Sequence, residues 1–143
     1  MSSIGKRFVP WAAPLLLFAL SGCSDGPKIV KVTGTLMYKG KPITNAFLHF
    51  EPERGRESWA ETDAEGRFKI NYDRHQDGAV VGKHKVWVEM RPTTPEEKEA
   101  AMMGKAPPLS KDMKAFFSKY NRENSTLEVQ IDKNIKELPL NLD

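Results

Sequence analysis

The chain has 143 residues, of which 39% are hydrophobic and 29% charged, with a single cysteine and three histidines. This length and composition fit one modest globular domain, and one cysteine excludes an intramolecular disulfide. The formal net charge is +3, and it falls to +1 when counting starts at Cys23, because Lys6 and Arg7 drop out and leave 20 basic against 19 acidic side chains. So balanced a charge excludes the basic footprint that nucleic-acid binding requires.

Residues 1–22 have the pattern of a bacterial export signal, because Lys6 and Arg7 precede an apolar run over residues 8–20. This run is shorter than the roughly 20 residues that a membrane-spanning helix needs. It ends in Leu20-Ser21-Gly22-Cys23, which resembles the lipobox of bacterial lipoproteins. The resemblance implies cleavage before Cys23 and attachment of acyl chains such as palmitate to it, so that membrane lipid is the first expected partner. The alternative is an ordinary secreted protein with a free thiol.

Residues 23–28 contain the small, polar and turn-forming residues that are typical of a tether. We therefore expect a lipidated tether over 23–28 that holds a domain of residues 29–143 close to a bacterial membrane. The expected location is the cell envelope, at the outer membrane or the periplasmic face.

Downstream of the tether, hydrophobic residues recur at every second position, which is typical of strands with one buried and one exposed face. Seven segments carry the pattern, namely 30–38, 46–50, 59–62, 68–72, 86–90, 127–131 and 138–142. Turn residues separate them, including Gly40-Lys41-Pro42 and Asp63-Ala64-Glu65-Gly66. Pro139 confines the last segment to a sheet edge. The pattern predicts an all-β fold in which about seven short antiparallel strands form a two-sheet sandwich.

Residues 92–125 interrupt the alternation. Thr94-Pro95-Glu96-Glu97 combines a capping threonine, a proline at the first helical position and a glutamate three residues after the cap, which predicts a helix over 95–103. A second helix is predicted from Ser110, with an apolar stripe of Met113, Phe116, Phe117 and Tyr120. We expect this short helical insertion, near 94–120, to pack on the sandwich.

Several segments, in order, resemble carboxypeptidase-regulatory-like, transthyretin-like (prealbumin-like) domains. They are Val32-Thr33-Gly34-Thr35-Leu36, Gly40-Lys41-Pro42-Ile43, Ala46-Phe47-Leu48-His49-Phe50 and Thr62-Asp63-Ala64-Glu65-Gly66-Arg67-Phe68. Gly82-Lys83-His84-Lys85-Val86 is similar to the Gly-x-Tyr-x-Val strand of these domains, with His84 in place of the usual aromatic residue. The resemblance covers roughly residues 30–142. It implies a non-catalytic β-sandwich that serves as a binding or assembly module, and it implies no ligand or cofactor.

Phe47, Trp59 and Trp87 fall in the outward phase of their strands, where polar residues are expected. In one interpretation, the apolar stripe of the second helix closes over them. In the other, they form a binding surface for an envelope protein or a carbohydrate, since tryptophan offers a flat face for stacking.

The histidines do not suggest catalysis. His49 lies in the outward phase and is expected to be solvated, His84 lies in the inward phase at a strand end, and His75 lies in a loop. No serine has the Gly-x-Ser-x-Gly setting of an activated nucleophile. We therefore expect a protein that is not an enzyme. The alternative is a metal-binding protein or metal-dependent enzyme of the same fold, with ligands from these histidines and from Tyr38, Tyr72 and Tyr120, although their spacing matches no ligand pattern.

Overall fold

The computed structural model describes residues 26–105 and 109–143. The predicted export signal and Cys23 lie outside this part of the chain. The strands are β1 (Ile29–Val30), β2 (Val32–Tyr38), β3 (Lys41–Pro42), β4 (Ala46–Pro52), β5 (Ser58–Glu61), β6 (Arg67–Lys69), β7 (Ala79–Val80), β8 (Gly82–Met90), β9 (Leu127–Ile131) and β10 (Ile135–Leu142). Each of the seven predicted segments overlaps a strand, although only residues 68 and 69 of the segment 68–72 lie in β6. The two-residue strands β3 and β7 are additional, because two residues are too few to show a period.

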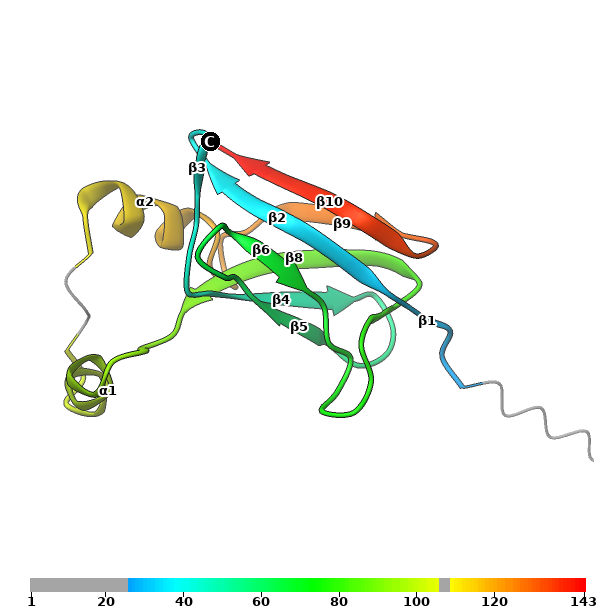
Figure 1. Ribbon diagram of the computed structural model, residues 1–143, viewed down its shortest axis with the longest axis horizontal. Coiled ribbons are helices and arrows are strands. Elements are labelled where there is room, and N and C mark those ends of the chain that lie inside the picture. Colours follow the sequence, from blue (N-terminus) through cyan, green and yellow to red (C-terminus); the bar gives the residue numbers. More distant parts are fainter. Residues whose placement is uncertain (1–25, 106–108) are drawn as a thin grey trace, which may run out of the picture.

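Two four-stranded sheets form the layers of the fold (Figure 1). One has the order β5-β4-β8-β9, and the other has the order β10-β2-β3, with β6 also paired to β2. A small sheet of β1 and β7 closes one end. The inward phase of the long strands is buried between the layers, as the alternation predicts; it includes Leu36, Leu48, Phe50, Phe68, Val86 and Val88. The protein is thus an all-β sandwich with two short helices.

One strand pairing differs from the prediction of a purely antiparallel fold. Strand β10 runs parallel to β2, with Leu140 opposite Leu36, whereas the other strand pairs are antiparallel in the described residues. The reason is that the chain does not turn back onto β9, but crosses from one sheet to the other. The amide of Ile135 donates to the carbonyl of Lys31, and Asn134 accepts from the amide of Lys31, which fixes the register of the new strand. Pro139 lies on this edge strand, as predicted.

Both predicted helices are present, as α1 (Pro95–Met102) and α2 (Lys111–Lys119). The capping box of α1 is complete, since the Thr94 hydroxyl accepts from the Glu97 amide and the Glu97 carboxylate accepts from the Thr94 amide. Ser110 caps α2 by accepting from the amide of Met113. Local sequence therefore determines where these helices begin.

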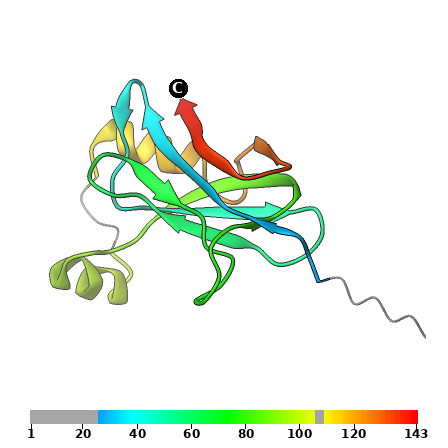
Figure 2. The same cartoon turned by 45° about the vertical axis from the view of Figure 1, so that its right-hand side comes forward.

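Helix α2 packs against one end of the core. Phe116 is fully buried, with its ring 4.9 Å from that of Tyr38 and 5.2 Å from that of Tyr120. Helix α1, in contrast, buries none of its residues and projects from the sandwich (Figure 2). Among the described residues, no helix is both long and apolar enough to cross a membrane.

Candidate binding site on the outer sheet face

The outer face is the surface of the β5-β4-β8-β9 sheet that points away from the core. Strand pairing places Trp59 of β5 and Trp87 of β8 on either side of His49 of β4. Phe47 lies two residues before His49 and therefore on the same face. Three strands thus bring the predicted surface residues Phe47, Trp59 and Trp87 together, around a histidine.

The four rings form a continuous ladder. The Phe47 and Trp59 rings stack at 5.5 Å, and those of His49 and Trp87 stack at 3.4 Å with an angle of 4°. The edge of one ring meets the other between Phe47 and His49, at 4.7 Å. Such offset and edge contacts stabilise aromatic pairs by about 0.5–1.5 kcal/mol each.

The ladder is covered by charged side chains. Phe47 and Trp87 are 5% and 9% exposed, whereas Trp59 and His49 are partly exposed. The guanidinium of Arg91 lies 3.6 Å from the centre of the Phe47 ring, and that of Arg122 lies 5.7 Å from that of Trp87. Both are cation–π contacts, which take the place of water over the rings. Charged side chains, here called the charged fringe, therefore lie over the aromatic rings of the outer face. Trp59 lies at the side that they leave open.

Carboxylates fix these two arginines. Glu61 contacts Arg91 at 3.3 Å, and Glu51 contacts Arg122 at 3.8 Å. Because each pair is solvent-exposed, the ion pairs themselves contribute little stability. Their effect is to hold the guanidinium groups over the rings.

The prediction that His49 is solvated is wrong. Its side chain is only 12% exposed, because its ring stacks on that of Trp87 and makes an edge contact with the ring of Phe47. Glu57 lies 2.5 Å from Nδ1, and Glu89 lies 3.3 Å from Nε2. Nε2 of His49 and Nε1 of Trp87 are nevertheless buried without a hydrogen-bond partner. His49 thus serves as a packing element between two carboxylates.

The interpretation in which the insertion over 92–125 closes over the aromatic residues holds only in part, because Arg122 of the insertion lies over the Trp87 ring but the apolar stripe of α2 packs elsewhere. Phe116 packs with Tyr38 and Tyr120 at the end of the core, and Phe117 contacts Phe116. The outer face is instead covered by arginines from the end of β8 and from the segment after α2. Sequence reasoning missed Arg91, although it continues the period of two that runs through Trp87 and Glu89.

The remaining histidines behave as predicted. His84 is fully buried in the inward phase of β8, and its Nε2 lies 2.7 Å from the carbonyl of Val80. His75 is exposed in a turn. His49 and His84 therefore lie on opposite faces of one sheet and cannot share a metal ion. In the part of the chain that the structure describes, no three His, Cys, Asp or Glu side chains are arranged to hold a metal.

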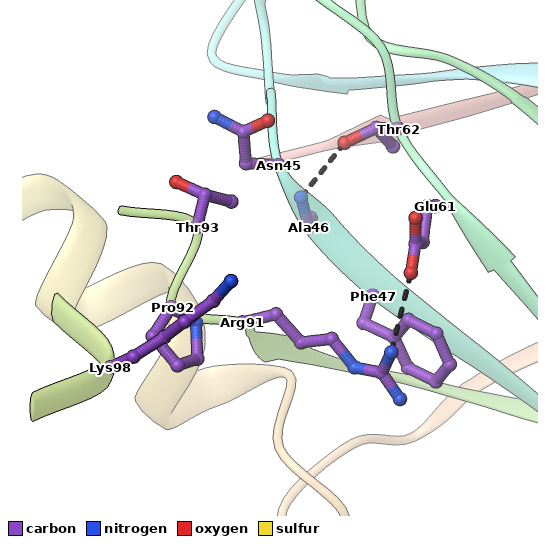
Figure 3. A pocket seen from close by; sticks show the side chains of 9 residues that line it. All are labelled: Asn45, Ala46, Phe47, Glu61, Thr62, Arg91, Pro92, Thr93 and Lys98. Atoms are coloured by element: carbon purple, nitrogen blue, oxygen red, sulfur yellow. Dashed lines mark hydrogen bonds and ion pairs between the residues drawn. The ribbon is translucent and has the colours of Figure 1, made fainter. Parts of the chain in front are cut away.

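A pocket of about 400 Å³ adjoins the outer face at the end of β8 (Figure 3). Nine residues line it, namely Asn45, Ala46, Phe47, Glu61, Thr62, Arg91, Pro92, Thr93 and Lys98. Figure 3 shows Arg91 beside Phe47 and its ion pair with Glu61, while Lys98 extends from α1. The pocket thus combines residues from β4, β5, the end of β8 and α1.

The backbone shapes the mouth of this pocket. Asn45 has a left-handed φ of 54°, and its amide donates to the carbonyl of Thr62. On the other side, Glu97 accepts hydrogen bonds from the amides of Thr93 and Thr94 and from the Thr93 hydroxyl, which hold the pKa of its carboxyl below the ordinary value. Glu97 is therefore committed to capping α1.

Comparisons with protein-family models, with curated proteins and with solved structures find no match to this chain. What the outer face and the pocket can do must follow from their own residues.

Proposed function

We propose that the protein is a lipid-anchored, non-catalytic binding module of the bacterial cell envelope, built on a transthyretin-like sandwich. The lipobox-like segment that ends at Cys23 and the motif order over residues 30–142 support this proposal. The structural observation that carries it is the position of β1, at the end of the sandwich opposite to α1 and α2 (Figure 1). A chain held by Cys23 through a six-residue tether would present its helical end away from the lipid.

Acylation of Cys23 is tested by producing the full chain in a bacterium with radiolabelled palmitate. The wild type and the control Ser24→Ala should both incorporate label and sediment with membranes, because two or more acyl chains bind a bilayer stably. Cys23→Ser should incorporate none. Equal labelling of Cys23→Ser would contradict the anchor. Palmitate labelling, and not sedimentation, decides whether Cys23 is acylated. The reason is that an uncleaved apolar segment could itself hold the Cys23→Ser variant on membranes.

We propose that the outer face binds another envelope protein. Trp59 supplies an aromatic contact at the open side, and the charged fringe of Arg91, Arg122 and Glu51 suits a partner surface of mixed charge. A carbohydrate is less well matched, because a sugar could stack on Trp87 only after Arg122 had moved.

This surface is tested by placing a photo-crosslinking phenylalanine analogue at position 59 of the full chain in living cells. The matched control places it at the exposed position of Lys136 on the other sheet. A discrete protein adduct from position 59 alone is expected. Equal adducts from both positions, or none from position 59, would refute a protein partner at this face.

A further inference from the structure

The two edges of the β5-β4-β8-β9 sheet differ in how their backbone is paired. At the first edge, the amide and the carbonyl of Trp59 in β5 both bond to Asn71, so that edge is closed at its centre. At the second edge, β9 pairs with β8 alone among the described residues. The chain then leaves β9 for the other sheet, where it forms β10 (Figure 1). The far side of β9 is therefore an open edge.

The register of β8 shows which groups of β9 point to this open edge. Successive residues of an antiparallel strand direct their N–H and C=O groups to opposite neighbours. The Lys83 carbonyl accepts a hydrogen bond from the amide that follows β4, so the groups of the next residue, His84, point to β9. Val129 is paired with His84 and points back to β8. Glu128 and Gln130, on either side of Val129, consequently direct their N–H and C=O groups away from the sheet.

The open edge thus presents four backbone groups, namely the N–H and C=O of Glu128 and of Gln130. Within residues 26–105 and 109–143, none of the four makes a hydrogen bond. Edge strands of natural proteins commonly carry a lysine, a proline or a bulge that prevents further pairing. Strand β9 has the sequence Leu-Glu-Val-Gln-Ile, and its register with β8 is regular, so none of these devices is present in it.

The side chains of β9 add an apolar surface to the open backbone. Leu127 and Val129 lie in the inward phase but are only partly buried at the side of the core. A strand beside β9 would place its alternate side chains against them. On the outer face, Glu128 is half-exposed and pairs with Lys83 at 3.0 Å. A second carboxylate opposite Glu128 would be repelled, so a polar or basic side chain is favoured there.

The tether argues against a second copy of β9 as the added strand. Two β9 strands related by a two-fold axis would pair antiparallel, so the β1 ends of the two copies would point in opposite directions. The tether of residues 23–28 spans at most about 20 Å, whereas β8 alone is about 30 Å long. Two such copies could not both be anchored in one membrane with their helical ends away from the lipid. A strand from another protein has no such constraint.

We infer that β9 accepts an extended segment of another envelope protein as an added strand. This inference rests on the proposed role as a binding module and specifies the mode of binding. The backbone groups of Glu128 and Gln130 supply the hydrogen bonds, as in other cases where a peptide extends a sheet. The side chains of β9 select a segment whose inward residues are apolar and whose residue opposite Glu128 is polar or basic.

The test uses a proline that removes an outward N–H group and leaves the pairs with β8 intact. Gln130→Pro lacks the N–H that an added strand needs, and proline is tolerated on an edge strand where the N–H faces solvent. Gln130→Ala is the matched control, because it removes the side chain and keeps the N–H. In living cells, the full chain carries a photo-crosslinking phenylalanine analogue at the exposed position of Thr126, next to β9.

A discrete protein adduct from position 126 is expected in the wild type and in Gln130→Ala, and its yield should fall about tenfold or more in Gln130→Pro. Mass spectrometry should locate the adduct in a partner segment with alternating apolar and polar residues. No adduct, an adduct with a second copy of this chain, a partner segment without the alternation, or equal yields from the two Gln130 variants would overturn the inference. An adduct from position 126 with none from position 59 would support the open edge and refute the outer face, so the two proposals fail separately.

Hydrogen exchange of the full chain in a nonionic detergent tests the open edge without any variant. The Gln130 amide should exchange about tenfold or more faster than the Val129 amide, because only the second is paired with β8. Equal protection of the two amides would overturn the open edge. Circular dichroism checks the folding of each variant. If Gln130→Pro does not fold, Glu128→Pro and its control Glu128→Ala apply the same comparison to the other outward N–H.

Discussion

Gly34 lies where strands β2, β6 and β10 meet, and its replacement by alanine tests the packing of that sheet. It is paired with Phe68 on one side and with Leu138 on the other. A Cβ atom at position 34 would come within 2.6 Å of Cζ of Phe68 and would also overlap the carbonyl oxygen of Leu138. The ring could rotate, but the carbonyl belongs to the backbone of β10 and cannot move without disturbing the parallel pairing.

Two opposed effects determine the magnitude. Alanine is favoured over glycine in a strand by about 0.5–1 kcal/mol, because it loses less backbone entropy on folding. Overpacking typically costs about 1–3 kcal/mol, and the cost lies at the upper end where backbone must shift. We therefore expect Gly34→Ala to lower the free energy of unfolding by about 1–2 kcal/mol.

Urea unfolding of the full chain in detergent measures this difference. Gly26→Ala is the matched control, since no atom lies within 4 Å of the added Cβ and its stability should equal that of the wild type. Phe68→Ala alone should cost about 3–5 kcal/mol. When Gly34→Ala is made in the Phe68→Ala protein, the loss of unfolding free energy that it causes should be smaller, because the ring is gone. It should not be zero, because the Leu138 carbonyl remains. A Gly34→Ala protein as stable as the control would refute the proposed close approach of β10 to β2.

Two further predictions concern the helical insertion. Phe116→Ala should lower the free energy of unfolding, measured in urea, by about 3–5 kcal/mol, because the ring is fully buried among aromatic neighbours. Phe117→Ala should lower it by less, because Phe117 is only partly buried. Equal losses in the two variants would contradict the packing of α2. The depressed pKa of Glu97 implies that its capping of α1 is fully present above its ordinary pKa of 4.5 and is lost as the pH falls through the lower folded value. Titration of Glu97 and of the Thr94 amide by NMR should show a common midpoint below 4.5, and Glu97→Gln should abolish the change at Thr94; a midpoint at or above 4.5 would refute the hydrogen-bonded cap.

The helices and strands whose positions depend on residues close in sequence could be predicted. Alternation located the strands, because one face of each is buried, and the Thr94 capping box located the start of α1, because its partners lie within three residues. The phase of each strand also placed His84 inside and Trp87 outside the sheet.

Features set by distant residues could not be predicted in the same way. The apolar stripe of α2 requires burial, but only the open end of the core decides that Phe116 meets Tyr38. The phase of β4 places His49 outward, yet its burial depends on the ring that a neighbouring strand brings to it. Likewise, no local signal indicates that β10 pairs with β2 instead of β9, because the choice depends on how the three-residue turn between β9 and β10 crosses the sandwich.

The pairing of β10 with β2 has a consequence for the order in which the protein can form. The contacts at the start of this pair join residues 103 positions apart, such as Lys31 and Asn134. Such long-range closure makes folding slow compared with that of helical proteins of similar size. A ribosome must therefore synthesise nearly the whole domain before the sheet around β2 is complete.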